Sequence, residues 1–145
     1  MSKVSTYLNF PGNTEEAFLF YQSIFGGEFI GGGVARFGDF PPGPDAPPQP
    51  ESVKNQIMHI ELALLGGHVL MGSDAPPEMG FKVNFGNNNM IMLEPDTRTE
   101  TRRLFDALSA GGIVTQNLEV MFWGALYGAC TDKFGVLWMF NCTEK

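Results

Sequence analysis

The chain has 145 residues, of which 43% are hydrophobic and 17% are charged, so it carries enough apolar material for a folded core and wholesale disorder is not expected. Its formal net charge of −7 repels phosphate backbones and anionic lipid surfaces, which argues against nucleic-acid and membrane partners. Two cysteines, Cys130 and Cys142, are too few for a disulfide framework, and the sequence shows neither a signal peptide nor a membrane-spanning apolar run, so we expect a cytoplasmic protein.

The chain begins with a predicted strand and a capped helix. Residues 4–10 are rich in β-forming side chains, and Pro11-Gly12-Asn13 ends this strand. Asn13 is a predicted N-cap, because Glu16 stands at the capping-box position three residues later. The helix is expected to end at Gly26-Gly27, since glycine commonly follows the last helical residue.

An irregular region follows. Residues 28–40 are predicted to be extended, with an interruption at Gly31-Gly32-Gly33. Residues 41–50 hold six prolines, which exclude regular helix and central strand. We interpret residues 41–50 as an exposed loop that serves as a lid, a dimer contact or a free connection.

The clearest strand signal covers residues 58–64. Apolar side chains alternate there with others, which places His59 and Glu61 together on one face. Gly66-Gly67 turns the chain, and residues 68–73 are predicted to return as the partner strand.

The length of this turn decides which residues face His59. A three-residue turn would pair His59 with Ser73 and Glu61 with Met71, whereas a two-residue turn would pair His59 with Asp74. In either register His59 is a candidate general base or hydrogen-bond anchor beside a carboxylate, or a structural tie between two strands. Glu61 is a candidate acid/base group, or simply a solvated side chain.

The second half of the chain repeats the order of the first. Residues 75–89 read as a connection, residues 90–93 as a strand, and Thr97 with Glu100 as a second capping box. Gly111-Gly112 closes the second helix. The remaining strand candidates are residues 113–121, 126–130 and 136–141.

An internal repeat supports this organisation. A shift of 85 positions superposes several features: Leu8 on Leu93, Leu19 on Leu104, Phe20 on Phe105, and Gly26-Gly27 on Gly111-Gly112. We therefore predict an α+β fold of two tandem βαβββ modules that form curved mixed sheets backed by helices. The modules are expected at about 1–75 and 88–145 within a single domain 1–145, with a linker at about 76–87.

Several motifs resemble a known family. They are Tyr7-Leu8-Asn9-Phe10-Pro11-Gly12-Asn13, Phe20-Tyr21, Met58-His59, Met71-Gly72-Ser73-Asp74, Phe122-Trp123 and Thr131-Asp132-Lys133-Phe134-Gly135-Val136. Together they resemble the PhnB-like branch of the vicinal-oxygen-chelate (glyoxalase/bleomycin-resistance/dioxygenase) superfamily. The resemblance implies two βαβββ modules and a homodimer. Some relatives carry a 3-demethylubiquinone methyltransferase label, which the sequence does not support, because no helix follows Gly31-Gly32-Gly33 as a cofactor-binding glycine turn requires.

Metal-dependent members of the superfamily place His, Gln or Glu on the first and last strand of each module. Carried over to this sequence, those positions fall on Thr6, Met71, Ile91 and Met139. None of these side chains is a good ligand for a hard or borderline divalent ion. We therefore predict no cofactor and disfavour a divalent metal, and we interpret Met71 and Met139 as apolar lining of a pocket.

Further ligand-binding candidates lie near the C-terminus. Trp123 follows Phe122 before a strand, and it is either a stacking surface for a ligand or a core anchor. Asn141 lies two residues beyond Met139 on the same strand face and is expected to supply a polar contact.

These observations predict a protein that binds a small molecule in a cleft between the modules without a metal. Its ligand-binding candidates are Met71, Ser73, Asp74, Trp123, Met139 and Asn141, and its candidate catalytic residues are His59 and Glu61. The alternative is a metal-dependent isomerase, lyase or dioxygenase acting on a small oxygenated substrate. A purely structural dimer has no positive feature in its favour.

Overall fold

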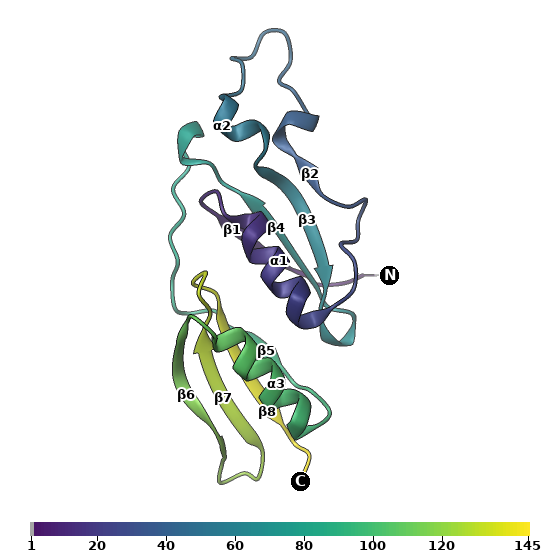
Figure 1. Ribbon diagram of the computed structural model, residues 1–145, viewed down its shortest axis with the longest axis vertical. Coiled ribbons are helices and arrows are strands. Elements are labelled where there is room, and N and C mark those ends of the chain that lie inside the picture. The colour runs from purple at the N-terminus through teal and green to yellow at the C-terminus, as the bar shows by residue number, and fades with distance from the viewer. Residues whose placement is uncertain (1) are drawn as a thin grey trace. The chain divides into compact units, whose positions relative to one another are not determined.

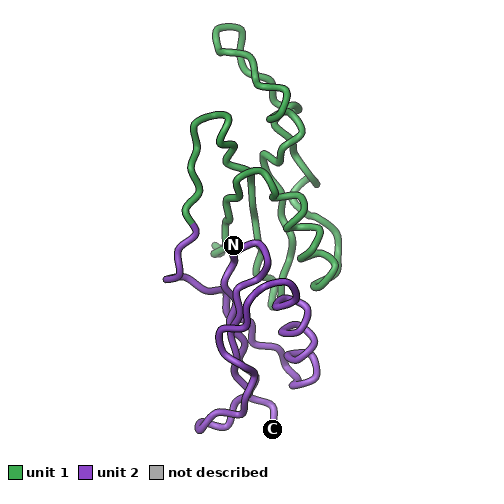
Figure 2. Tube along the Cα trace, turned by 60° about the vertical axis from the view of Figure 1, so that its left-hand side comes forward, with its two compact units in different colours: residues 1–84 green, residues 85–145 purple. Residues whose placement is uncertain are grey.

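The protein divides into two compact units. The structure, a computed structural model, describes residues 2–145. Residues 1–84 form unit 1 and residues 85–145 form unit 2 (Figure 2). The division falls inside the segment 76–87 that the sequence predicts as a linker. Each unit is described by itself below.

Unit 1 has one sheet and one long helix. Its regular elements are β1 (Thr6–Phe10), α1 (Thr14–Phe25), β2 (Ala35–Arg36), α2 (Glu51–Lys54), β3 (Ile57–Ala63) and β4 (Val69–Asp74), with 3-10 turns at Phe37–Asp39, Leu65–Gly67 and Pro77–Met79. The strand order is β1-β4-β3-β2, and only the β1–β4 pair is parallel. Helix α1 covers one face of this sheet (Figure 1). This is the predicted βαβββ arrangement.

Unit 2 repeats that arrangement. Its elements are β5 (Ile91–Leu93), α3 (Arg98–Ser109), β6 (Ile113–Val120), β7 (Leu126–Thr131) and β8 (Leu137–Cys142). The strand order is β5-β8-β7-β6, with β5 parallel to β8 and the other pairs antiparallel. Helix α3 covers one face of the sheet (Figure 1). The α+β class and the tandem mixed sheets are therefore confirmed.

Each core lies between a helix and one face of its sheet. In unit 1 the rings of Phe18 and Tyr21 on α1 meet edge to face at 5.7 Å, and both residues are fully buried. In unit 2 Phe105 on α3 meets Phe140 on β8 at 5.3 Å. Because each unit has a single long helix, the opposite face of each sheet is not covered by a helix of its own unit.

The internal repeat is correct for the strands but not for the helices. A shift of 85 positions superposes Leu19 on Leu104, yet Leu19 is 51% exposed and Leu104 is fully buried. The buried Ala17 and Phe18 instead match Leu104 and Phe105, a shift of 87 positions. The loop before α3 (94–97) is one residue longer than the loop before α1 (11–13).

The predicted caps have different outcomes. Thr97 does cap α3, because its Oγ1 accepts a hydrogen bond from the backbone N–H of Glu100 at 3.1 Å. The side chain of Asn13 makes no capping bond, so the predicted capping box with Glu16 is wrong. Asp74, at the end of β4, replaces it.

The carboxylate of Asp74 organises the start of α1. Its Oδ1 accepts hydrogen bonds from Gly12 N at 3.1 Å, Thr14 N at 3.0 Å and Thr14 Oγ1 at 2.6 Å. Its Oδ2 accepts the N–H of Ile57 at 2.8 Å, at the start of β3. One buried carboxylate therefore ties α1, β3 and β4 together, and its charge suits the positive end of the helix dipole.

The proline-rich segment is irregular, as predicted. Residues 41–50 contain no helix or strand, and they extend away from the sheet (Figure 1). The short helix α2 that follows was not predicted from the sequence. Across residues 2–145, no helix combines the length and apolarity needed to cross a bilayer.

Asp74→Asn tests the role of this carboxylate. An amide nitrogen at one of the two oxygen positions would face a backbone N–H donor, so we expect the free energy of unfolding to fall by about 2–4 kcal/mol. Urea denaturation measures this loss, and Asp45→Asn in the exposed loop is the control, with little expected change. Equal stability of the two variants would contradict the proposed anchoring role.

Candidate functional site

The uncovered face of the unit 1 sheet carries the predicted polar residues. A Cβ built on Gly72 of β4 would lie 2.6 Å from the ring of Phe18, so Gly72 faces α1. Its neighbours Met71 and Ser73 therefore face the other way. Tyr7 on β1 and Glu61 on β3 both pair with Met71, which puts them on this open face beside it.

His59 lies at the centre of this group. Its Nε2 is 3.1 Å from Glu61 Oε2, and its Nδ1 is 3.3 Å from the hydroxyl of Tyr7. An ionised carboxylate can only accept a hydrogen bond, so Nε2 carries a hydrogen. In the neutral ring Nδ1 is then an acceptor, and the hydroxyl of Tyr7 donates to it.

A glycine backbone covers Glu61. A Cβ placed on Gly31 would lie 1.9 Å from Glu61 Oε2, so the carboxylate occupies the space that a side chain there would need. Gly31 has φ +69°, and Gly32 and Gly33 also have positive φ. The Ile30 N–H further donates to the carbonyl of Glu61 at 3.0 Å. The interruption predicted at residues 31–33 is therefore a segment that closes over one end of the site.

The predicted hairpin register is confirmed in its three-residue form. The turn is Leu65–Gly67, and Glu61 pairs with Met71. The two-residue alternative, which would pair His59 with Asp74, is wrong. Asp74 is buried on the helix side of β4, so the carboxylate beside His59 is that of Glu61.

Ser73 and His68 make other contacts. Ser73 Oγ donates to Asn9 Oδ1 at 3.2 Å on the open face. The second histidine, His68, has its Nε2 2.8 Å from Thr6 Oγ1. Thr6 and Leu70 are paired residues of β1 and β4, so His68 joins the ends of two strands.

The donor set does not fit a family-type metal ion. The carried-over positions hold Thr6, Ile91, Met71 and Met139, which offer a hydroxyl that contacts His68, an alkyl chain and two thioethers. Within residues 2–145, no three His, Cys, Asp or Glu side chains are placed to hold a metal. His59, Glu61, His68, Asp74 and Glu119 are among the side chains of which this is true.

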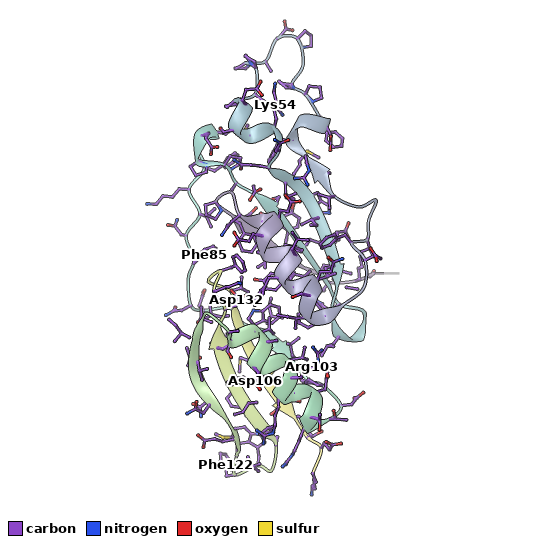
Figure 3. The ribbon with its side chains drawn as sticks, viewed as in Figure 1. Lys54, Phe85, Arg103, Asp106, Phe122 and Asp132 are labelled. Carbon is purple, nitrogen blue, oxygen red and sulfur yellow. The ribbon has the colours of Figure 1, made fainter. Side chains whose placement is uncertain are left out.

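Unit 2 presents a more apolar open face. Ala129 of β7 pairs with Met139 of β8, and Tyr127 pairs with Asn141, so these side chains share one face. The ring of Trp123 contacts Tyr127 edge to face at 5.9 Å. The candidates Trp123, Met139 and Asn141 thus belong to one surface. Phe122 lies at the tip of the β6–β7 hairpin, where it is 96% exposed (Figure 3).

The two sheets differ at equivalent positions. Met71 on β4 and Met139 on β8 occupy equivalent positions in the two sheets. Glu61 pairs with Met71 and Ala129 pairs with Met139, so Glu61 and Ala129 are equivalent as well. His59 lies two residues before Glu61 on β3, and Tyr127 lies two residues before Ala129 on β7, so these two residues are also equivalent. The histidine–carboxylate pair is therefore specific to unit 1.

The cysteines have no role in this site. Both are buried and unbridged. Burial raises the pKa of the Cys130 thiol to about 12, and the charge of Asp132 adds to the rise. Cys130 therefore stays protonated and is a poor nucleophile at neutral pH.

Comparison with known proteins identifies the family. The model of the 3-demethylubiquinone-9 3-methyltransferase family matches residues 2–140. Protein YjdN of Escherichia coli K12 is 30% identical over 147 residues, which cover 98% of this chain and 96% of that protein. The chain belongs to this family, the PhnB-like branch of the vicinal-oxygen-chelate superfamily.

Solved structures agree with this assignment. Protein PA1353 from Pseudomonas aeruginosa is 36% identical with a TM-score of 0.82, and the match covers 100% of both chains. A Bacillus cereus protein described as a putative 3-demethylubiquinone-9 3-methyltransferase, PhnB protein, is 24% identical with a TM-score of 0.72 over 97% of this chain and 99% of that one. A glyoxalase/bleomycin resistance protein/dioxygenase family enzyme from Burkholderia phytofirmans shares the fold, at 15% identity and a TM-score of 0.59 over 96% and 98% of the two chains.

Tyr7 is the site residue that the sequence analysis did not single out. It appeared only inside a family motif, because its partner His59 is 52 positions away along the chain. Strand alternation on β1 would place Tyr7 and Asn9 on one face, but only the parallel β1–β4 pairing shows that this face also holds Met71.

Gly31→Ala tests the fit of Glu61 under its glycine cover. The new methyl group would displace the carboxylate, so we expect the His59–Glu61 hydrogen bond to be lost. The ¹⁵N chemical shifts of the His59 ring measure this. Gly32→Ala is a matched control, since it imposes the same kind of positive-φ strain with no atom within 4 Å of its Cβ. Identical His59 spectra for the two variants would contradict the described packing.

Proposed function

We propose that this protein binds a small, neutral organic molecule on the open face of the unit 1 sheet, without a bound metal. The observation that carries the proposal is the Tyr7–His59–Glu61 hydrogen-bonded chain on a face that no helix of its unit covers. Met71 lies between Tyr7 and Glu61 and offers an apolar contact. A few oriented polar groups beside apolar surface are typical of small-molecule sites.

Charge favours a neutral ligand over an anionic one. The open-face positions of β1, β3 and β4 include Glu61 but no lysine or arginine. Arg36, in the neighbouring β2, is paired with Glu15 at 2.6 Å. A carboxylate or phosphate ligand would therefore meet the charge of Glu61 with no lysine or arginine on these three strands to balance it.

The remaining candidates support binding in different degrees. Ser73 is close to the chain of polar groups and suits a ligand contact. Asp74 does not, because both of its oxygens already accept buried backbone hydrogen bonds. The open face of unit 2 carries an aromatic ring, a thioether and one amide, from Trp123, Met139 and Asn141. We propose this face as a second contact surface for apolar ligands.

The family description does not lead us to propose methyl transfer. Cofactor-binding methyltransferases need a parallel α/β sheet with a glycine turn that opens a helix. Each sheet here is mixed, and the Gly31–Gly33 segment leads into strand β2. A homodimer in the cytoplasm stays a prediction from the family resemblance and the low cysteine content.

A second candidate is catalysis at the same site. A histidine held between a carboxylate and a hydroxyl is an arrangement that moves protons, which favours an enzyme with acid/base groups. Metal-dependent chemistry of the superfamily type is the further alternative. Elemental analysis of tag-free protein tests it, because about one equivalent of a transition metal would require a ligand set other than the one described.

His59→Ala tests the binding proposal. Compounds that raise the melting temperature of the wild-type protein would be titrated into the variant by calorimetry. We expect Kd to rise by about tenfold or more while the free energy of unfolding changes by less than about 1 kcal/mol, because His59 is a partly exposed surface residue.

His68→Ala is the matched control, since it removes the other histidine and leaves the open face intact. We expect its Kd to stay near the wild-type value. A large loss of stability in His59→Ala with unchanged binding would instead make His59 a structural tie between strands.

A further inference from the structure

The three groups of the site form an ordered chain from the interior to solvent. The side chain of Glu61 is 14% exposed and that of His59 is 32% exposed. Tyr7, at the outer end, is 48% exposed as a residue. The two ring nitrogens of His59 have different partners, because Nε2 contacts the partly buried carboxylate of Glu61 and Nδ1 contacts the exposed hydroxyl of Tyr7.

The sequence of groups from Glu61 through His59 to Tyr7 is typical of an activated nucleophile. A partly buried carboxylate orients a histidine, the histidine accepts a proton from a hydroxyl, and the hydroxyl oxygen is open to a reacting molecule. The Tyr7–His59 separation of 3.3 Å is slightly longer than an ideal hydrogen bond, as is common for such pairs before a substrate is bound. Their rings are tilted by 36° with centroids 5.7 Å apart, so they do not stack in parallel.

We infer that Tyr7 is the reactive group of this site, a phenol nucleophile activated by His59 and Glu61 that accepts an acyl group from small neutral esters. The inference rests on the proposed function, because the ester must first bind on the open face of unit 1. Tyr7 and His59 act on the substrate and its protons, and Glu61 is a positioning residue.

Transfer of the acyl group to Tyr7 needs only the ester and the side chains of the site. The oxygen of Tyr7 forms a bond to the carbonyl carbon of the ester, and its proton moves to His59 Nδ1. The bond between that carbon and the alkoxy or aryloxy oxygen breaks, the leaving oxygen keeps the electron pair, and His59 Nδ1 returns the proton to that oxygen. Glu61 stabilises the resulting imidazolium through Nε2–H. Water then releases the acid and restores the phenol.

The surroundings of Tyr7 suit a neutral ester. Met71 is paired with Tyr7 and gives an apolar contact for a short acyl chain. Asn9 lies two residues along β1 on the same face, and its Oδ1 accepts a hydrogen bond from Ser73. That bond leaves the amide N–H groups of Asn9 to donate to an ester carbonyl.

The test uses p-nitrophenyl acetate as the ester and detects both products. Released p-nitrophenolate is followed by absorbance, and acid-quenched protein is digested and analysed by mass spectrometry. We expect the acetyl group on Tyr7, and a release rate at least about tenfold above that of Tyr7→Phe. Tyr21→Phe is the matched control, because this tyrosine is fully buried against Phe18 on the helix side of the sheet, and its rate should equal that of wild type.

Variants of the other two groups separate activation from folding. His59→Ala should lower the rate by about a hundredfold, and added imidazole should restore part of it. Glu61→Gln should lower the rate and also change the ¹⁵N shifts of the His59 ring. Circular dichroism and urea denaturation confirm that each variant is folded.

The inference is overturned if Tyr7→Phe releases p-nitrophenolate at the wild-type rate, or if the acetyl group is found only on other residues. Ligand titration keeps this failure apart from failure of the proposed function. If compounds bind with an affinity that depends on His59 but Tyr7 is not acetylated, the binding proposal stands and the nucleophile is rejected. If no compound binds and Tyr7 is not acetylated, both are rejected.

Discussion

The structure depends on one packing constraint: each four-stranded sheet has a single long helix to cover it. That helix buries one face, where aromatic residues such as Phe18 and Phe140 pack without solvent. The other face has no helical cover within its unit, so its residues need not be apolar. In unit 1 this freedom permits a phenol, an imidazole and a carboxylate to lie next to one another. In unit 2 the equivalent positions hold apolar and aromatic groups, so the histidine–carboxylate pair is found on the open face of unit 1 alone.

Two carboxylates of unit 1 have opposite roles because they lie on opposite faces. Asp74 is enclosed on the helix side, where four hydrogen bonds from Gly12, Thr14 and Ile57 satisfy its charge and join three elements. Glu61 lies on the open side, and its Oε2 contacts His59 under the backbone of Gly31. The first gives the sheet and helix a defined geometry. The second gives the site a fixed orientation of the histidine, and a ligand can approach from the Tyr7 end.

Much of this arrangement follows from local sequence rules, and the rest depends on contacts between distant residues. Alternation along residues 58–64 and the three-residue turn place His59 and Glu61 on one face and pair Glu61 with Met71. The repeat aligned the two helices two positions away from the match of their buried side chains, because the alignment used sequence matches and not the face that each helix buries. The cap of α1 was assigned to Asn13 because capping rules are local, whereas the real acceptor, Asp74, is 60 positions away from Thr14. Tyr7 was missed for the same reason, since its link to His59 requires β1 to pair with β4.

We propose that a small molecule binds on the open face of unit 1. Proton–carbon NMR of protein labelled at its methionine methyl groups tests it most directly, because Met71 lies on that face and Met79 lies in an exposed turn of the same unit. Met71→Leu assigns the Met71 signal. We predict that compounds that stabilise the protein shift the Met71 signal and leave that of Met79 unchanged. Stabilising compounds that leave Met71 unmoved while shifting other methionine signals would contradict the account.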